Sequence, residues 1–308
     1  MNSHTVAIVN SSSGAPADND AGKRLRDVLQ SRQLNWEIWP ARDGGELSVL
    51  AQKAAESAAD IVVAGGGDGT LNAVGSRLAG TDKTFGVLPL GTLNHFAKDL
   101  NIPLDLGAAV DNIAAGRVAR IDVGEVNGQI FLNNSSIGLY PKIIARRDAQ
   151  RKHGRPKWIA FISALFRTLR QYAAFRVQVS ADGERFTRRT PILFVGNNEY
   201  LIEGRSLGAR RCLDTGKLCL YVLHNTGPWG LLKFAFRALI RRAWRAKDFD
   251  ALQAREIDVH TKRKKTRLAF DGEIAEMETP LRYRIRTGAL KVIVPAITEP
   301  GSMRPSAP

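Results

Sequence analysis

A glycine-rich run, Gly65-Gly66-Gly67-Asp68-Gly69-Thr70, is the strongest chemical signal in this sequence of 308 residues. Glycines let the backbone approach a phosphate closely, and the first amides of a following helix bind anions. Asp68 adds a carboxylate that could hold a magnesium ion between phosphates. The run matches neither the Walker A pattern nor G-x-G-x-x-G. It predicts a nucleotide-phosphate loop and indicates an ATP-dependent kinase, with a tight strand-to-helix turn as the purely structural alternative.

A second glycine turn lies downstream, at Pro89-Leu90-Gly91-Thr92-Leu93-Asn94. It also follows an apolar run and precedes a segment with helical spacing. Ligands of open parallel sheets bind at the carboxyl ends of the strands, so we expect both glycine turns to converge on one crevice. Thr92 and Asn94 offer polar groups to a nucleotide there, while Thr92 could also cap the helix that follows.

These turns need a parallel sheet to position them, and the first 122 residues predict one. Short apolar runs alternate with amphipathic segments, as is typical of a parallel sheet covered by helices on both faces. We therefore expect an α/β nucleotide-binding domain over residues 1–122. Its strands are expected at residues 6–9, 36–39, 61–64 and 85–88, and its helices at 21–31, 46–58 and 71–78.

The pattern changes after about residue 121, where short strands separated by polar turns dominate. We expect a mostly antiparallel β-sandwich domain over residues 123–295, with two helical insertions. The tail over residues 296–308 is rich in Pro, Gly, Ser and Ala and is expected to be disordered. Strands are expected at residues 121–126, 129–132, 176–180, 191–195, 217–223, 267–270 and 281–286.

The bulk composition points to an anionic partner. The net charge of +15 arises from 45 Lys and Arg residues against 30 Asp and Glu residues. The two cysteines, Cys212 and Cys219, form neither a disulfide framework nor a metal-binding pattern. No basic segment precedes the short apolar run Val6 to Val9, and no apolar run approaches the ~20 residues that span a bilayer. The sequence therefore predicts a cytoplasmic protein.

Five motifs together resemble the bacterial diacylglycerol kinase-like lipid kinases, which are relatives of the sphingosine kinases. The first alone is weaker, because NAD kinases and phosphofructokinases also carry it. The five occur in the family's order over nearly the whole chain. They are Gly66-Gly67-Asp68-Gly69-Thr70-Leu71-Asn72, Pro89-Leu90-Gly91-Thr92 with Asn94 and Phe96-Ala97, Ile121-Asp122-Val123-Gly124, Val195-Gly196-Asn197-Asn198, and Asp271-Gly272-Glu273.

The resemblance implies transfer of the γ-phosphoryl group of ATP to a lipid hydroxyl, in a cleft between an NAD kinase/phosphofructokinase-like α/β domain and the β-sandwich domain. It implies that Asp68 and Asp122 position Mg²⁺. Glu273 would accept the hydroxyl proton, with Asp271 beside it. From the residues alone, Asp271-Gly272 reads as a two-residue turn between strands. The residues implied to bind ATP are Asn10, Gly66, Gly67, Asp68, Gly69, Thr70, Asn72 and Thr92.

Three positions depart from the family pattern. His95 stands where an Asp is usual, which removes one acidic member of the magnesium network. Ala15 follows Gly14 where a basic residue is common, which weakens the phosphate contacts expected there. Thr215 replaces one of two adjacent Asp residues that bind a structural magnesium in relatives, which weakens the case for a second metal.

Two basic amphipathic segments, residues 158–169 and 229–246, suggest how the chain reaches a lipid. Basic helices with aromatic edges are typical of membrane interfaces, although such helices can also pack on a β domain. The run Lys262-Arg263-Lys264-Lys265 reads as a solvated turn. We therefore expect a lipid substrate, an anionic membrane surface at the inner face of the membrane as partner, and no nucleic acid, with a homodimer as an open alternative to a monomer.

Two other functions fit parts of the sequence. One is a soluble small-molecule kinase resembling an NAD kinase, which shares the first glycine run. The other is a non-catalytic protein that binds anionic surfaces and keeps a vestigial nucleotide site, an idea supported by His95 and Thr215. The acceptor also stays open among diacylglycerol, a sphingoid base, phosphatidylglycerol and an undecaprenyl-type alcohol.

Overall fold

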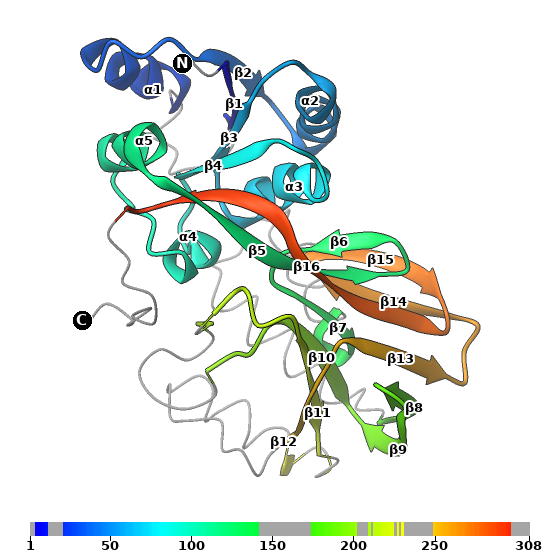
Figure 1. The fold of residues 1–308 in the computed structure, drawn as a ribbon. Helices are drawn as coiled ribbons and strands as arrows, with labels where there is room; N and C mark the ends of the chain where they lie inside the picture. Colours follow the sequence, from blue (N-terminus) through cyan, green and yellow to red (C-terminus); the bar gives the residue numbers. More distant parts are fainter. Residues whose placement is uncertain are drawn as a thin grey trace. The chain divides into compact units, whose positions relative to one another are not determined.

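The computed structural model describes residues 4–11, 21–141, 174–201, 209–210, 212–224, 227, 229–230 and 249–296 (Figure 1). The chain divides into two compact units. The first unit consists of Met1–Val123, Arg211–Thr215 and Arg286–Pro308. The second unit consists of Gly124–Arg210 and Gly216–Ile285.

The first unit is built on a parallel sheet in the strand order β2-β1-β3-β4-β16. Its strands are β1 (Thr5–Asn10), β2 (Glu37–Ala41), β3 (Ile61–Gly66), β4 (Thr84–Pro89) and the later part of β16 (Leu281–Val294). All four neighbouring pairs run parallel. The apolar run Val6 to Val9 is at most 1% exposed, because helices cover both faces of the sheet.

In the described part of the chain, five helices flank this sheet: α1 (Ala21–Ser31), α2 (Gly44–Glu56), α3 (Asp68–Leu78), α4 (His95–Asp99) and α5 (Leu106–Ala115). Leu25 of α1 and Val110 of α5 share a core cluster with Ala7, Val63 and Leu88 of the sheet. Helices α2 and α3 lie on the opposite side (Figure 1). The expected α/β domain is confirmed.

The second unit contains two antiparallel sheets that enclose one core, which confirms the expected β-rich domain. One is a six-stranded sheet in the order β12-β11-β10-β7-β14-β15, and the other is the antiparallel part, β16-β13-β8-β9, of the ten-stranded sheet that also contains β2-β1-β3-β4. Their inner faces contribute Ile137, Leu193, Val179, Ile257 and Tyr283 to this core. The strands are β7 (Asn134–Gly138), β8 (Phe175–Ala181), β9 (Glu184–Thr190), β10 (Ile192–Asn197), β11 (Leu218–Leu223), β12 (Phe249–Ala254), β13 (Glu256–Thr261), β14 (Lys265–Phe270) and β15 (Glu273–Glu278).

Two strands belong to both units. Strand β5 (Arg117–Val126) pairs with β6 (Gln129–Phe131) and leaves the first unit after Val123, close to the expected boundary at residue 122. Strand β16 pairs with β13 through Val259↔Leu281 and later with β4 through Lys291↔Thr84. Residues 286–294 therefore join the first unit, whereas we expected them in the β-sandwich domain.

Several expectations concern residues outside those described. They are the basic segments 158–169 and 231–246, the residues after Ser13, and the tail from residue 297. Lys262, Arg263 and Lys264 form an exposed turn between β13 and β14. Among the described residues, none of the helices has the length and apolar character needed to cross a membrane.

Candidate active site

The first glycine run forms the turn from β3 into α3. Gly66 has no room for a side chain, because a Cβ atom there would lie only 2.5 Å from the Cβ of Thr70. Thr70 is 4% exposed, and its hydroxyl accepts a hydrogen bond of 3.0 Å from the side-chain amide of Asn10 at the end of β1. The sequence-predicted residues Asn10, Gly66 and Thr70 thus lie together at the carboxyl ends of neighbouring strands.

Gly69, in the first turn of α3, differs from Gly66. Apart from its own helix turn, a Cβ atom there would meet no described residue within 4 Å, and the residue is exposed. Glycine weakens a helix relative to alanine, and packing within the described chain does not explain why position 69 is a glycine. The first amides of a helix bind phosphate groups, and a glycine in this turn leaves room beside the backbone for one. The residues of this turn therefore fit a nucleotide phosphate.

Asn72, two residues beyond Thr70, is 4% exposed. Its side-chain oxygen is buried and accepts no hydrogen bond from any described residue. An unpaired buried acceptor is unfavourable, by about 1–3 kcal/mol. Asn72 therefore remains a candidate for contact with a bound group, as the sequence predicted.

The second glycine turn packs directly on the first. A Cβ atom on Gly91 would lie 2.8 Å from Oδ1 of Asn94 and closer still to Cα of Gly67. The backbone of Asn94 has the left-handed conformation, with φ of 50°. Its side-chain oxygen accepts a hydrogen bond of 3.0 Å from the amide of Gly91, and its side-chain nitrogen donates to the carbonyls of Gly91 and Pro89. Its side chain therefore shapes the turn. Thr92 is exposed and does not cap α4, because α4 begins after Asn94.

Asp68 links the two turns. It is the first residue of α3, and its Oδ1 accepts a hydrogen bond of 3.0 Å from the amide of Phe96 in the first turn of α4. This bond satisfies one of the helix amides that have no partner within α4. In the described part of the chain, the other carboxylate oxygen makes no hydrogen bond or ion pair. That oxygen is suited to a magnesium ion.

Asp122 occupies a different environment on β5. It is 2% exposed, and its carboxylate accepts from the amide of Gly288 on β16 at 2.9 Å. Its own amide donates to the carbonyl of Leu213 at 2.7 Å, which holds the segment 211–215 in the first unit. In the described ranges, no group of three or more His, Cys, Asp or Glu side chains could enclose a metal ion. The metal-binding role of Asp122 stays a prediction.

In the second unit, Asp271 and Gly272 form the two-residue turn between β14 and β15. Their φ values are 47° and 89°, as a type I′ hairpin turn requires. The Asp271 carboxylate accepts hydrogen bonds from the amides of Leu132, Asn133 and Asn134 at 2.6, 2.8 and 2.9 Å. Burial raises the pKa of Asp271 to about 6, although the three amides and the charge of Arg210 act in the opposite direction. Asp271 is thus both a turn residue and an anchor.

Glu273 follows this turn as the first residue of β15, opposite Phe270. Its side chain is exposed, whereas all the acceptor bonds of Asp271 just described go to backbone amides. Of the two carboxylates in the motif, Glu273 is therefore the exposed one, and its role as proton acceptor stays a prediction.

Sequence reasoning missed the group that surrounds the Asp271 anchor. Arg210 is 4% exposed and donates to the carbonyl of Leu132 at 2.6 Å and to the side-chain oxygen of Asn133 at 2.8 Å. Asn197, from a family motif, also donates to the carbonyl of Leu132, at 2.9 Å. The paired asparagines at 133–134 and 197–198 were the available signal, but nothing in the sequence connected them to Arg210.

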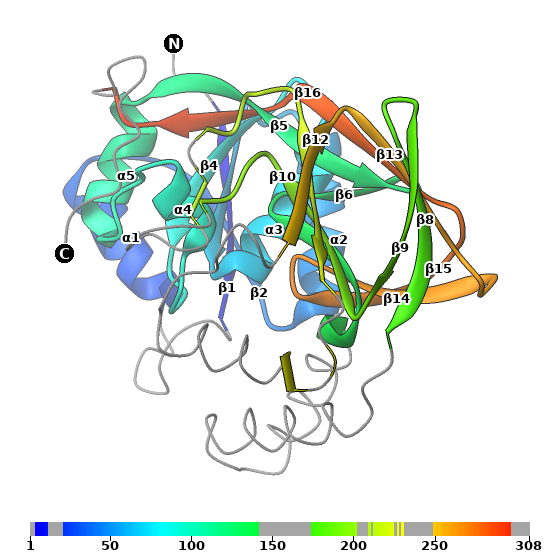
Figure 2. The ribbon, with the colours of Figure 1, turned by 90° about the horizontal axis from the view of Figure 1, so that it is seen from below.

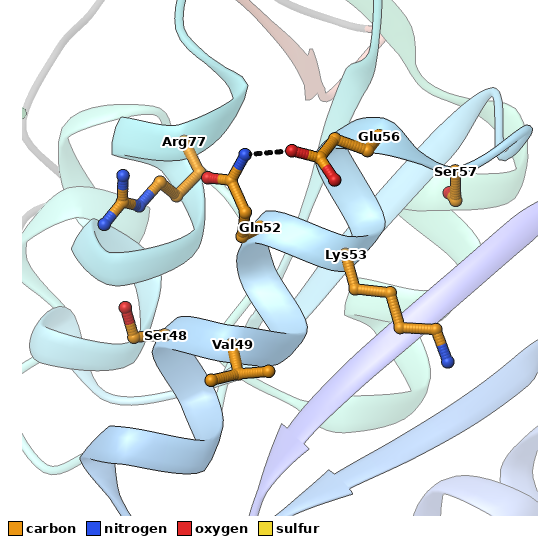
Figure 3. A pocket seen from close by; sticks show the side chains of 7 residues that line it. All are labelled: Ser48, Val49, Gln52, Lys53, Glu56, Ser57 and Arg77. Atoms are coloured by element: carbon orange, nitrogen blue, oxygen red, sulfur yellow. Dashed lines mark hydrogen bonds between the residues drawn. The ribbon is translucent and has the colours of Figure 1, made fainter.

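A surface pocket of about 760 Å³ lies elsewhere in the first unit, between α2 and α3 (Figure 3). Gln52 and Glu56 are hydrogen bonded within it, and the amine of Lys53 lies 4.5 Å from the centre of the Trp39 ring. It contains none of the predicted site residues. It is lined by Ser48, Val49, Gln52, Lys53, Glu56, Ser57 and Arg77.

Comparison with known proteins decides the family. Residues 4–126 match the diacylglycerol kinase catalytic domain, and residues 140–294 match the YegS C-terminal NAD kinase beta sandwich-like domain. The chain belongs to the diacylglycerol kinase-like lipid kinase family. It is therefore a kinase, as the sequence predicted, and its family uses a nucleotide as phosphoryl donor.

Individual relatives agree with this assignment. A probable lipid kinase YegS-like of Pectobacterium atrosepticum is 29% identical over 72% of this chain and 75% of its own length. A diacylglycerol kinase of Staphylococcus saprophyticus is 27% identical over 66% of this chain and 68% of its own. The crystal structure of a diacylglycerol kinase from Bacillus anthracis superimposes with a TM-score of 0.70 over 96% of this chain and 98% of its own. At 23% identity, that similarity supports the fold.

Proposed function

We propose that this kinase transfers the γ-phosphoryl group of ATP to the hydroxyl group of a membrane lipid, with diacylglycerol as the first acceptor to test. The observation that carries the proposal is the open space at Gly69. The same turn contains Thr70, which is hydrogen bonded to Asn10, and Asp68, of which one carboxylate oxygen accepts a hydrogen bond from Phe96. The names of the relatives, diacylglycerol kinase and lipid kinase, support a lipid acceptor.

In the proposed reaction, the acceptor oxygen forms a bond to the γ-phosphorus while the bond from that phosphorus to the β–γ bridging oxygen breaks. ADP leaves, and the hydroxyl proton passes to the carboxylate of Glu273. Asp271 holds the turn that presents Glu273. Asp68, with Asp122 as the second candidate, would hold Mg²⁺, which neutralises phosphate charge when it is bound.

A basic sheet surface in the second unit supports contact with an anionic membrane. Strands β8 and β9 lie side by side (Figure 2). Their register places Arg176 directly opposite Arg189, and the alternation along β9 puts Arg185 on the same face as Arg189. All three are exposed and form no ion pair within the described ranges. Like charges directly opposite each other destabilise a sheet. Anionic headgroups would offset that repulsion, so we propose that this surface faces the membrane.

Incubation with radiolabelled ATP, Mg²⁺ and each candidate lipid in mixed micelles tests the proposal. We expect label in a chloroform-soluble product that requires an added lipid. Label only in water-soluble products would support the NAD kinase-like alternative. The absence of any transfer, with ATP still bound, would support a non-catalytic protein instead.

A further inference from the structure

Arg210 and Asp271 hold the same short segment from two sides. The Arg210 guanidinium donates to the carbonyl of Leu132, to the side-chain oxygen of Asn133 and, at 3.3 Å, to the carbonyl of Asn197. The Asp271 carboxylate accepts from the three amides of residues 132–134. A cation thus faces oxygen atoms of this segment while an anion faces its N–H groups. We call this arrangement the Arg210–Asp271 clamp.

The clamp is buried and closed by further bonds. Arg210 is 4% exposed, and its guanidinium lies 5.7 Å from the centre of the Tyr200 ring. The Tyr200 hydroxyl donates to the carbonyl of Asn133 at 3.0 Å. The charge of Arg210 also lowers the pKa of Asp271 across the segment that both residues hold. Arg210 and Asp271 therefore depend on each other, although the Leu132–Asn134 segment lies between them.

The hairpin itself does not require this clamp. Asp271-Gly272 already has the composition that favours a type I′ turn, and the antiparallel pairing of β14 with β15 extends from Phe270↔Glu273 to Lys265↔Glu278. The clamp adds a fixed connection between the tip of the hairpin and the chain that links β6 to β7. It acts together with the pairing of β14 and β7, which ends at Phe270↔Ser135, and with the bond of 2.9 Å from the Asp271 amide to the Asn134 carbonyl. We propose that these contacts together fix the position of Glu273, two residues after Asp271.

We infer that Arg210 is a positioning residue for phosphoryl transfer, because it fixes the Leu132–Asn134 segment on which the Asp271-Gly272-Glu273 turn is anchored. The inference rests on the proposed function in one respect, namely that Glu273 accepts the proton. Misplacing a catalytic group by about 1 Å can lower a rate about 100-fold. Arg210 would thus affect turnover without touching the substrate.

The test uses the full chain with Arg210→Met, which removes the charge and keeps much of the volume, and Arg210→Lys, which keeps the charge. Arg32→Met is the matched control, since it removes an arginine–carboxylate pair with Asp111 in the first unit. We expect Arg210→Met to lower kcat about 100-fold, with the KM for ATP essentially unchanged. Arg210→Lys should fall between Arg210→Met and the unaltered chain, because an ammonium group lacks the fork of donors that reaches two oxygens.

Two further measurements separate positioning from general stability. Amide hydrogen exchange should become faster at residues 132–134 in Arg210→Met and stay unchanged in Arg32→Met. The ionised Asp271 carboxylate accepts the three amide bonds, and the charge of Arg210 lowers its pKa. Amide exchange at residues 132–134 should therefore begin to rise with acidification at a higher pH in Arg210→Met than in the unaltered chain or in Arg210→Lys, and kcat should fall with it.

Unchanged exchange at residues 132–134 in Arg210→Met would overturn the inference, whatever the activity. So would increased exchange with a normal kcat. If the unaltered chain phosphorylated no lipid, the proposed function would fail, while the exchange experiment would still decide whether Arg210 holds the anchor.

Discussion

Replacing Gly69 with alanine should strengthen the fold and weaken ATP binding at the same time. Apart from its own helix turn, the new methyl group would meet none of the residues that the structure describes within 4 Å, and Gly69 does not have a positive φ. Alanine is favoured over glycine in a helix by up to about 1 kcal/mol. For a domain of this size, that gain corresponds to a rise of about 2–4 °C in Tm.

The loss in binding follows from the same open space. If a phosphate oxygen approaches the amides of this turn, the methyl group displaces it and breaks at least one charge-assisted hydrogen bond, worth about 1.5–3 kcal/mol. The Kd for ATP should therefore rise about 10- to 150-fold. Titration calorimetry with Mg²⁺ and ATP measures the affinity, and thermal unfolding without nucleotide measures the stability.

Gly44→Ala is the matched control, because Gly44 is exposed and lies at the start of helix α2. A methyl group added there would also meet no described residue within 4 Å outside its own turn. It should raise Tm and leave ATP binding alone. Gly91→Ala should instead lower Tm, because its methyl group would lie 2.8 Å from Oδ1 of Asn94 and closer still to Cα of Gly67, which drives the two glycine turns apart. If Gly69→Ala gained stability and bound ATP as tightly as before, the phosphate-site reasoning would be refuted.

Three other changes test separate parts of the site. Glu273→Gln should lower kcat by about 100- to 10,000-fold and leave the Kd for ATP unchanged, and near-normal turnover would exclude a proton-acceptor role. The pKa of Asp271 lies above its ordinary value, so its contribution to stability is complete below about pH 4 and declines as the pH rises through about 6. Urea unfolding should show this decline, of about 3 kcal/mol, and Asp271→Asn should abolish it. Arg176→Gln should relieve about 0.2–1 kcal/mol of repulsion and weaken binding to anionic vesicles at low salt. Arg26→Gln on α1 is the control and should leave vesicle binding unchanged. Equal binding by the two variants would argue against a role of the basic surface in membrane binding.

The first unit was predictable because its elements follow apolar periodicity. Three of the four expected strands, such as 61–64 in β3, are short apolar runs that the sheet buries, whereas 36–39, near β2, contains Glu37 and is only partly buried. Helix α1 was found at its expected residues, Ala21–Ser31. In the second unit, strands β7, β9, β12, β13 and β15 were not predicted. The polar, alternating residues of β9 and β15 include few apolar positions, with Phe186 in β9 partly buried against the core. A strand with one exposed face carries a weaker sequence signal.

The site was predictable only where one segment carries its own chemistry. The glycine run indicates a phosphate loop without any knowledge of its neighbours. Asn94 bonds to Gly91 and Pro89 within its own turn, whereas the role of Arg210 depends on contacts that only the folded chain creates. Arg210 and Asp271 both form hydrogen bonds with Leu132, from which they are separated in sequence by 78 and 139 residues. No local pattern specifies such partners.

The passage of β16 through both units has a consequence for how the chain is made. The parallel neighbour of β4 comes from Lys291 and Val292, late in the sequence. The ribosome therefore synthesises the first 123 residues long before the strand that completes their sheet exists. Until then, β4 has an open edge, and exposed strand edges invite pairing with other chains. The parallel sheet of the first unit is therefore complete only after the second unit has been synthesised.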